Sequence, residues 1–128
     1  GGAGGCLEAA YNCGNKGLEQ RGAHRLHAFC EWIFSECGPA ALQPTVIVTG
    51  HSFWFRTFFQ VYLPRTAYHD CKHAKLVNCG VVMFELEQLQ SPEGEGAEYR
   101  VAPESVVTLY GGFEEKQPRG RVAARKKA

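Results

Sequence analysis

The stretch Thr45-Val-Ile-Val-Thr-Gly-His-Ser-Phe-Trp-Phe-Arg56 carries the most information about the fold of this 128-residue chain. The apolar and β-branched residues at 45–49 predict a buried strand, and Gly50 then allows the backbone to turn sharply. His51 and Ser52 follow at the start of a predicted helix, where the first backbone N–H groups have no partner within the helix. A phosphate group would find hydrogen-bond donors and a favourable helix dipole there.

A purely structural reading of this junction stays open. Strand–Gly–helix junctions recur in α/β proteins, and a histidine in one of them also serves to cap the helix or to hydrogen-bond a neighbour. The junction therefore predicts an α/β fold more firmly than it predicts a phosphate site.

Length and composition fit one modest globular domain or part of a larger one: 45% of the residues are hydrophobic and the formal net charge is +1. No apolar run approaches the ~18 residues that cross a bilayer, which predicts that no segment spans a membrane. The chain starts with a Gly-rich segment (1–17) and no methionine, which indicates a processed or incomplete sequence. It ends in a basic tail (114–128), read as a solvated end because a nucleic-acid contact is less common.

Six cysteines and two histidine clusters raise the question of metal binding. No C-x-x-C pair occurs, so reduced, scattered thiols and an intracellular compartment, cytoplasm or organelle matrix, are expected. Structural zinc sites gather four ligands from well-spaced pairs, which the clusters lack. The sequence therefore predicts no metal and no cofactor. The clusters are His24, His27 and Cys30, and His69, Cys71 and His73.

The other elements follow in a simple order. Apolar residues at helical spacing predict a helix from about Leu18 to Cys37, with Leu26, Phe29 and Ile33 on its buried face and Trp32 beside it. The near-continuous apolar strand at 45–49 indicates a sheet that is parallel in part. A second, aromatic-rich helix is predicted from Phe53 to Leu63, ending before Pro64. Three more strands are predicted at Val77–Leu86, Tyr99–Ala102 and Val106–Tyr110.

Taken together, four ordered motifs resemble the C-terminal half of the histidine phosphatase superfamily, and most closely its phosphoglycerate mutase-like proteins. The motifs are the strand-Gly-His51-Ser52 junction with Arg56, then Leu63-Pro64, then Lys75-Leu-Val-Asn78-Cys-Gly-Val-Val, then Tyr110-Gly-Gly-Phe113. Asn12-Cys-Gly-Asn-Lys16 and the helix after it fit the same subgroup. The resemblance spans about Asn12 to Phe113 and rests on the ordered set, since no single motif is specific.

The resemblance implies a three-layer α/β/α sandwich, with 18–113 as the C-terminal part of the domain, and chemistry through a phosphohistidine. His51 matches the family's second histidine, which hydrogen-bonds an oxygen of the transferring phosphoryl group. The backbone N–H of Ser52 would add a donor, and Arg56 and Asn78 are further candidates for phosphate binding. For Asn78 and Arg56 a structural role, in Arg56 an ion pair, remains equally open.

The chain departs from the family in lacking an Arg-His-Gly sequence, which carries the nucleophilic histidine. Two hypotheses follow. In the first, the chain is the C-terminal part of a phosphatase or phosphomutase that acts on a phosphate ester, inactive alone and with an incomplete sheet. In the second, it is a non-catalytic subunit whose open sheet edge and aromatic helix are buried against protein partners.

Overall fold

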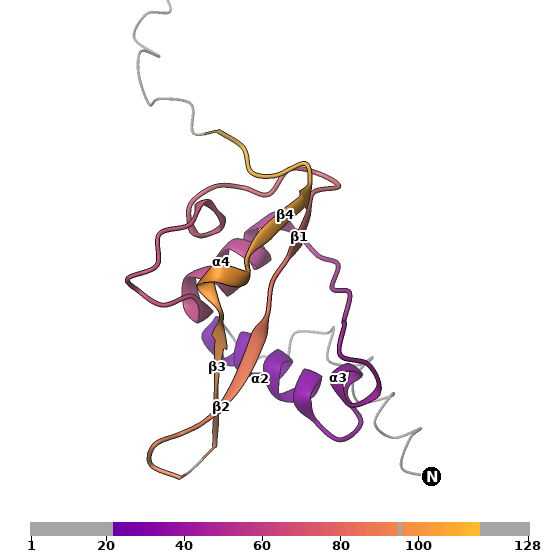
Figure 1. Ribbon diagram of the computed structural model, residues 1–128, viewed down its shortest axis with the longest axis vertical. Coiled ribbons are helices and arrows are strands. Elements are labelled where there is room, and N and C mark those ends of the chain that lie inside the picture. Colours follow the sequence, from indigo (N-terminus) through magenta and orange to yellow (C-terminus); the bar gives the residue numbers. More distant parts are fainter. Residues whose placement is uncertain (1–21, 95, 116–128) are drawn as a thin grey trace, which may run out of the picture.

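The computed structural model describes residues 22–94 and 96–115, which form a mixed α/β structure (Figure 1). The helices are α2 (Ala23–Phe34), α3 (Pro39–Leu42) and α4 (Ser52–Tyr62), with single 3-10 turns η1 (Asp70–Lys72) and η2 (Pro103–Ser105). The strands are β1 (Val81–Met83), β2 (Leu86–Gln90), β3 (Ala97–Val101) and β4 (Val107–Tyr110). No helix within these ranges is long and apolar enough to span a membrane.

Helix α2 confirms the central part of the first predicted helix. Leu26, Cys30 and Ile33 are buried, at the spacing of four and three residues that places side chains on one helix face. The segment 18–21 lies outside the described residues. Trp32, predicted beside the buried face, is about one-third exposed (36%).

The end of α2 comes three residues before the predicted one, for a local reason. The Ser35 hydroxyl and backbone N–H both donate to the carbonyl oxygen of Trp32, at 2.7 and 3.2 Å, while Ser35 itself is extended. A Cβ atom on Gly38 would overlap the carbonyl oxygens of Trp32 and Ile33. The chain can therefore reverse onto the end of α2 only with glycine at this position.

Helix α4 agrees with the prediction to within one residue at each end. Leu63 donates its N–H to the carbonyl of Phe59 at 3.0 Å and then adopts an extended conformation (φ −75°, ψ 142°). Pro64 explains this end, because the residue before proline is pushed out of the helical region.

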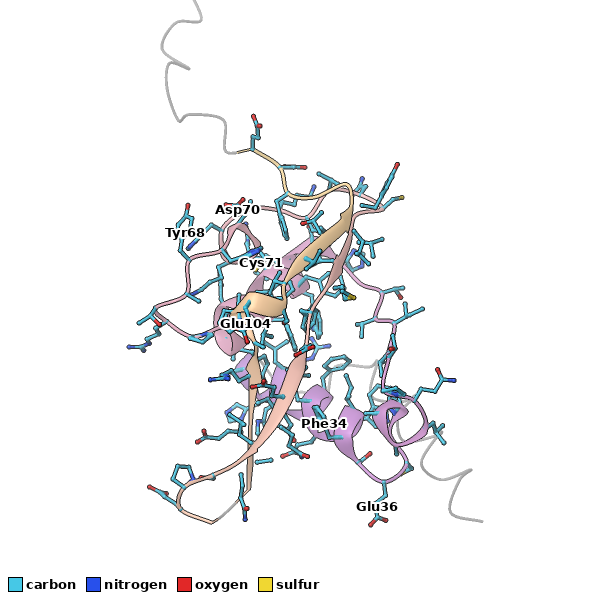
Figure 2. The ribbon with its side chains drawn as sticks, viewed as in Figure 1. Phe34, Glu36, Tyr68, Asp70, Cys71 and Glu104 are labelled. Carbon is cyan, nitrogen blue, oxygen red and sulfur yellow. The ribbon has the colours of Figure 1, made fainter. Side chains whose placement is uncertain are left out.

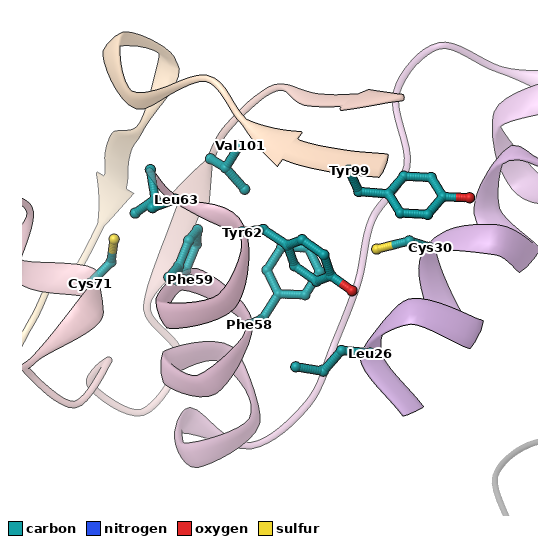
Figure 3. Close-up of a cluster of buried hydrophobic side chains, with 9 residues drawn as sticks. All are labelled: Leu26, Cys30, Phe58, Phe59, Tyr62, Leu63, Cys71, Tyr99 and Val101. Carbon is teal, nitrogen blue, oxygen red and sulfur yellow. The ribbon is translucent and has the colours of Figure 1, made fainter. Parts of the chain in front are cut away.

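The core forms where α4 packs against α2, β3 and η1. Phe58 is 1% exposed and its ring lies 4.8 Å from that of Tyr62 and 5.7 Å from that of Phe84. Figure 3 shows Cys30 and Leu26 of α2 facing this side of α4. The buried cluster comprises Leu26, Cys30, Phe58, Phe59, Tyr62, Leu63, Cys71, Tyr99 and Val101.

The four strands form two antiparallel ribbons, β1 with β4 and β2 with β3. Five residue pairs join β2 to β3, from Leu86↔Val101 to Gln90↔Ala97. The β1–β4 register shifts between Val81 and Val82. The two strands predicted at Tyr99–Ala102 and Val106–Tyr110 are thus confirmed to within two residues, whereas Val77–Leu86 is a strand only at β1 and at Leu86.

One hydrogen-bonded crossing joins the two ribbons. Between β1 and β2, Glu85 donates its N–H to the Ser105 hydroxyl at 2.8 Å, and its carbonyl accepts the N–H of Ala102 at 3.1 Å. The Ser105 hydroxyl in turn donates to the carbonyl of Ala102 at 2.6 Å. The segment from β1 through Glu85 to β2 therefore lies antiparallel to the segment from β3 through η2 to β4.

The predicted strand at 45–49 is wrong for the part of the chain that the structure describes. None of these five residues belongs to a strand, and no parallel strand pair occurs among residues 22–94 and 96–115. Ile47, expected to be buried, is 88% exposed. A strand exists only where a second one accepts its hydrogen bonds, so an apolar pattern alone does not create it. The mixed α/β class stands, but a three-layer sandwich is not seen.

The expectation of reduced thiols is wrong at Cys37, which is disulfide-bonded. The thiols of Cys30, Cys71 and Cys79 are free. Disulfides join residues distant in sequence, so the absence of C-x-x-C does not argue against them. The expected intracellular compartment stays a prediction.

Candidate functional site

The N-terminus of α4 has the geometry expected of an anion site. His51 is the N-cap residue in an extended conformation (φ −92°, ψ 147°), and its carbonyl accepts the N–H of Phe55 at 3.2 Å. Its side chain is exposed and makes no capping hydrogen bond. The N–H groups of Ser52, Phe53 and Trp54 precede the first one that the helix itself can bond. The imidazole and these donors are accordingly available to a ligand at one helix end.

Arg56 lies one turn further along the same helix. Its guanidinium carbon is 5.4 Å from the centroid of the Phe53 ring, a cation–π contact, and no ion pair of Arg56 is found in the described part of the chain. Side chains of a helix lean towards its N-terminus and meet those three or four residues earlier. Arg56 therefore lies on the Ser52–Phe53 side of α4, and its phosphate-binding role stays a prediction.

Asn78 lies in the tight turn before β1. Gly80 donates its N–H to the carbonyl of Val77 at 2.9 Å, closing the turn, and Cys79 within it has a positive φ of 62°. Asn78 is exposed, and no hydrogen bond joins it to α4 within residues 22–94 and 96–115. The structure thus places His51 and Ser52 at the start of α4 and Arg56 one turn further along it, and no hydrogen bond among the described residues links Asn78 to them.

Two of the quoted motifs, Lys75–Gly80 and Tyr110–Phe113, do meet. Val77 donates its N–H to the carbonyl of Gly112 at 2.9 Å, and Leu76 forms an isolated β-bridge with Phe113. A Cβ atom on Gly111 would lie 3.1 Å from the Cα of Gly80. The backbones of Gly80 and Gly111 therefore lie close together, and a side chain on Gly111 would disturb this contact.

Neither histidine cluster assembles a metal site. Among the described residues no three His, Cys, Asp or Glu side chains are grouped to hold an ion. In the second cluster the Nδ1 of His69 accepts the N–H of Cys71 at 3.1 Å, which caps η1. Figure 2 shows Tyr68 directed outward and Cys71 on the side of the loop towards the fold. The buried thiol of Cys71 therefore lies between the half-buried His69 and the exposed His73.

Lys72 is a buried cation that the sequence reading passed over. It is 9% exposed, and its Nζ donates to the carbonyls of Pro64 and Ala67, each at 3.1 Å. Its own carbonyl accepts the Gln60 amide at 2.7 Å. The amine thus holds the loop after α4 against that helix, a structural task. A lysine between a buried cysteine and a loop histidine gives no signal of this in the sequence.

The free thiols of the described residues, Cys30, Cys71 and Cys79, are expected to differ sharply in reactivity. Burial raises the pKa of the Cys30 thiol to about 11, opposed by a hydrogen bond with Tyr62, and burial raises that of Cys71 to about 12, opposed by a backbone hydrogen bond and Lys72. Iodoacetamide at pH 8 should alkylate the exposed Cys79 and spare both buried thiols until denaturant is added, as peptide mass mapping will show. Rapid native labelling of Cys30 would contradict the described packing.

The two buried thiols, Cys30 and Cys71, predict that the free energy of unfolding falls in alkali. Both folded-state pKa values lie above the ordinary value of 9.0, so the unfolded chain ionises first as pH rises. Their contribution is fully present below pH 9 and is lost as pH rises through about 11 and 12.

The comparisons with known proteins leave the chain without an assigned relative. No family model matches it, and neither does a curated protein or a solved structure. The arguments about function therefore rest on the residues and their geometry.

Proposed function

We propose that this chain supplies the phosphate-binding part of a histidine phosphatase-like or phosphoglycerate mutase-like site, with His51 as the stabilising histidine. The observation that supports the proposal most is the exposed His51 side chain, free of capping bonds, at the N-terminus of an 11-residue helix. The backbone donors of Ser52 and Phe53 and the helix dipole favour an oxyanion at that end.

The chemistry follows from where the charge develops. During phosphoryl transfer, negative charge on the equatorial oxygens is stabilised by fixed donors. The His51 imidazole would donate to one such oxygen and the Ser52 N–H to another, while Arg56 balances the net charge. None of these groups is a nucleophile in this scheme.

The proposal requires a nucleophile from elsewhere. The 128 residues contain no Arg-His-Gly, and the other histidines sit in different settings: His24 and His27 on α2, His69 and His73 at the two ends of η1. We therefore expect phosphate binding without turnover from this chain alone, because the covalent step has no attacking group.

The test is binding of inorganic phosphate and of a phosphate monoester such as phosphoglycerate, measured by thermal shift and calorimetry at fixed ionic strength. Wild type should be stabilised in proportion to ligand. His51→Ala should weaken binding about tenfold, the loss expected for one hydrogen bond between charged groups.

The matched control is His73→Ala, which removes an exposed histidine at the end of η1, away from any helix N-terminus. It should bind phosphate as wild type does. Equal binding by wild type and His51→Ala would remove the basis of the proposal, and so would turnover by the isolated chain that survives His51→Ala.

A second candidate function, a non-catalytic subunit of an assembly, is favoured by the apolar outer face of the β1–β4 ribbon. Val81, Met83, Val107 and Leu109 are 48, 53, 45 and 58% exposed. Contiguous apolar surface of this kind is common at protein interfaces. Under this alternative the chain ignores phosphate and binds a hydrophobic dye strongly; weak dye binding by a monomer would contradict it.

A further inference from the structure

The segment 45–49 between α3 and α4 offers a complete, unused set of strand hydrogen bonds. None of its N–H or C=O groups bonds to the backbone of any residue in the described ranges. The flanking residues Gln43 and His51 are both extended, and Figure 1 shows the chain running from α3 to α4 without a turn back. Ile47 is 88% and Val48 37% exposed. A free strand edge of this kind is a template for another strand.

The sequence of the segment is a palindrome. Thr45-Val-Ile-Val-Thr49 reads the same in both directions and carries no charge. In an antiparallel pair centred on Ile47, each threonine faces a threonine and each valine a valine. Cross-strand pairs of β-branched residues and Thr–Thr pairs are favourable, and no like charges meet.

We propose that two copies of this chain pair antiparallel through residues 45–49, about a twofold axis at Ile47. An isologous interface requires one surface to complement itself, and a palindromic neutral strand does so in one register. A shift by one residue would put the faces of the two strands out of step. Pro44, which has no N–H, and the start of α4 at Ser52 limit the paired length at the two ends.

This pairing is independent of the phosphate site. Each His51 would lie four residues from the axis, so the two imidazoles would be separated by eight residue steps, about 27 Å at ~3.4 Å per residue. Each copy keeps its own helix end, and loss of one property leaves the other measurable.

Cysteine cross-linking tests the register directly, in the full chain carrying Cys79→Ser, which removes the exposed free thiol of the described residues. Each yield is compared with that of Cys79→Ser alone, because Cys6 and Cys13 remain in the chain. Ile47→Cys places a thiol opposite its own copy, ~4.5–5.5 Å apart between Cα atoms and within disulfide reach. Thr45→Cys is the control on the same strand face, because its two copies would lie ~14 Å apart. The double variant Thr45→Cys/Thr49→Cys restores directly opposed thiols.

The expected result is a covalent dimer for Ile47→Cys and for the double variant, and little for Thr45→Cys. Wild type should sediment at twice the chain mass of 14.1 kDa. Ile47→Lys should be a folded monomer with the circular-dichroism spectrum of wild type, because two lysines would oppose each other at a site exposed in the single chain. Val61→Lys, an exposed aliphatic on α4, should stay dimeric.

Three results would overturn the inference: a wild-type monomer at all soluble concentrations, a dimer unaffected by Ile47→Lys, or Thr45→Cys linking as readily as Ile47→Cys. A monomer that still binds phosphate through His51 would refute the pairing and leave the proposed function intact.

Discussion

Phe58→Ala is expected to lower the free energy of unfolding by about 3–5 kcal/mol, the largest single effect that this fold predicts. The side chain is 1% exposed and lies at the centre of the aromatic cluster. Its ring centroid is 5.3 Å from that of Trp54 in a stacked arrangement and 5.9 Å from that of Phe59 edge to face. Truncation removes these contacts and leaves a cavity that the rigid neighbouring rings fill poorly. Urea denaturation followed by circular dichroism measures the change.

The control for this experiment lies on the same helix. Phe53 is 69% exposed and its described contact is the one with Arg56. Phe53→Ala should change stability by less than ~1 kcal/mol. If the two variants unfold at the same denaturant concentration, the packing of α4 described here is wrong.

Gly111→Ala is expected to lower the free energy of unfolding by about 2–5 kcal/mol, from two terms that can be separated. Gly111 has φ +76°, and a left-handed conformation costs other residues ~1–2 kcal/mol. An added Cβ atom would also lie 2.6 Å from the Cγ2 of Val77, and relieving that overlap costs a further ~1–3 kcal/mol. Tm and chemical denaturation together give the total.

Gly94 isolates the first term. It has the same φ of +76°, and nothing lies within 4 Å of the position where its Cβ would be. Gly94→Ala should therefore cost only the conformational term. If both variants lose the same free energy of unfolding, the side chain of Val77 moves aside at no energetic cost. The contact between the motifs Lys75–Gly80 and Tyr110–Phe113 would then not be tightly packed.

The elements that were predicted well from the sequence are those whose ends are determined by residues at or next to the ends themselves. Helix α4 is bounded by an extended N-cap residue and by Pro64, and both ends were predicted to within a residue. The end of α2 was missed because it depends on a serine that bonds back to Trp32 and on a glycine that the reversed chain touches. Contacts of that kind are tertiary and leave no periodic pattern.

The segment 45–49 shows why a local sequence pattern cannot by itself predict a strand. Its residues are all good strand formers, yet whether they form a strand depends on a partner that the pattern does not contain. The same holds for the site. His51 and Ser52 were found because helix starts have a sequence signature, whereas the place of Asn78 depends on how the turn closed by Val77 and Gly80 packs.

The hydrogen bonds at Glu85 and Ser105 have a consequence for the order of folding. They make the two ribbons one long bent hairpin, whose arms start from the turn at 91–96 and reach Val81 and Tyr110. All strand pairing found among the described residues is thus encoded within one contiguous stretch. Pairing can spread outward from that turn in short steps of loop closure, and it needs no chain reversal through the helical part.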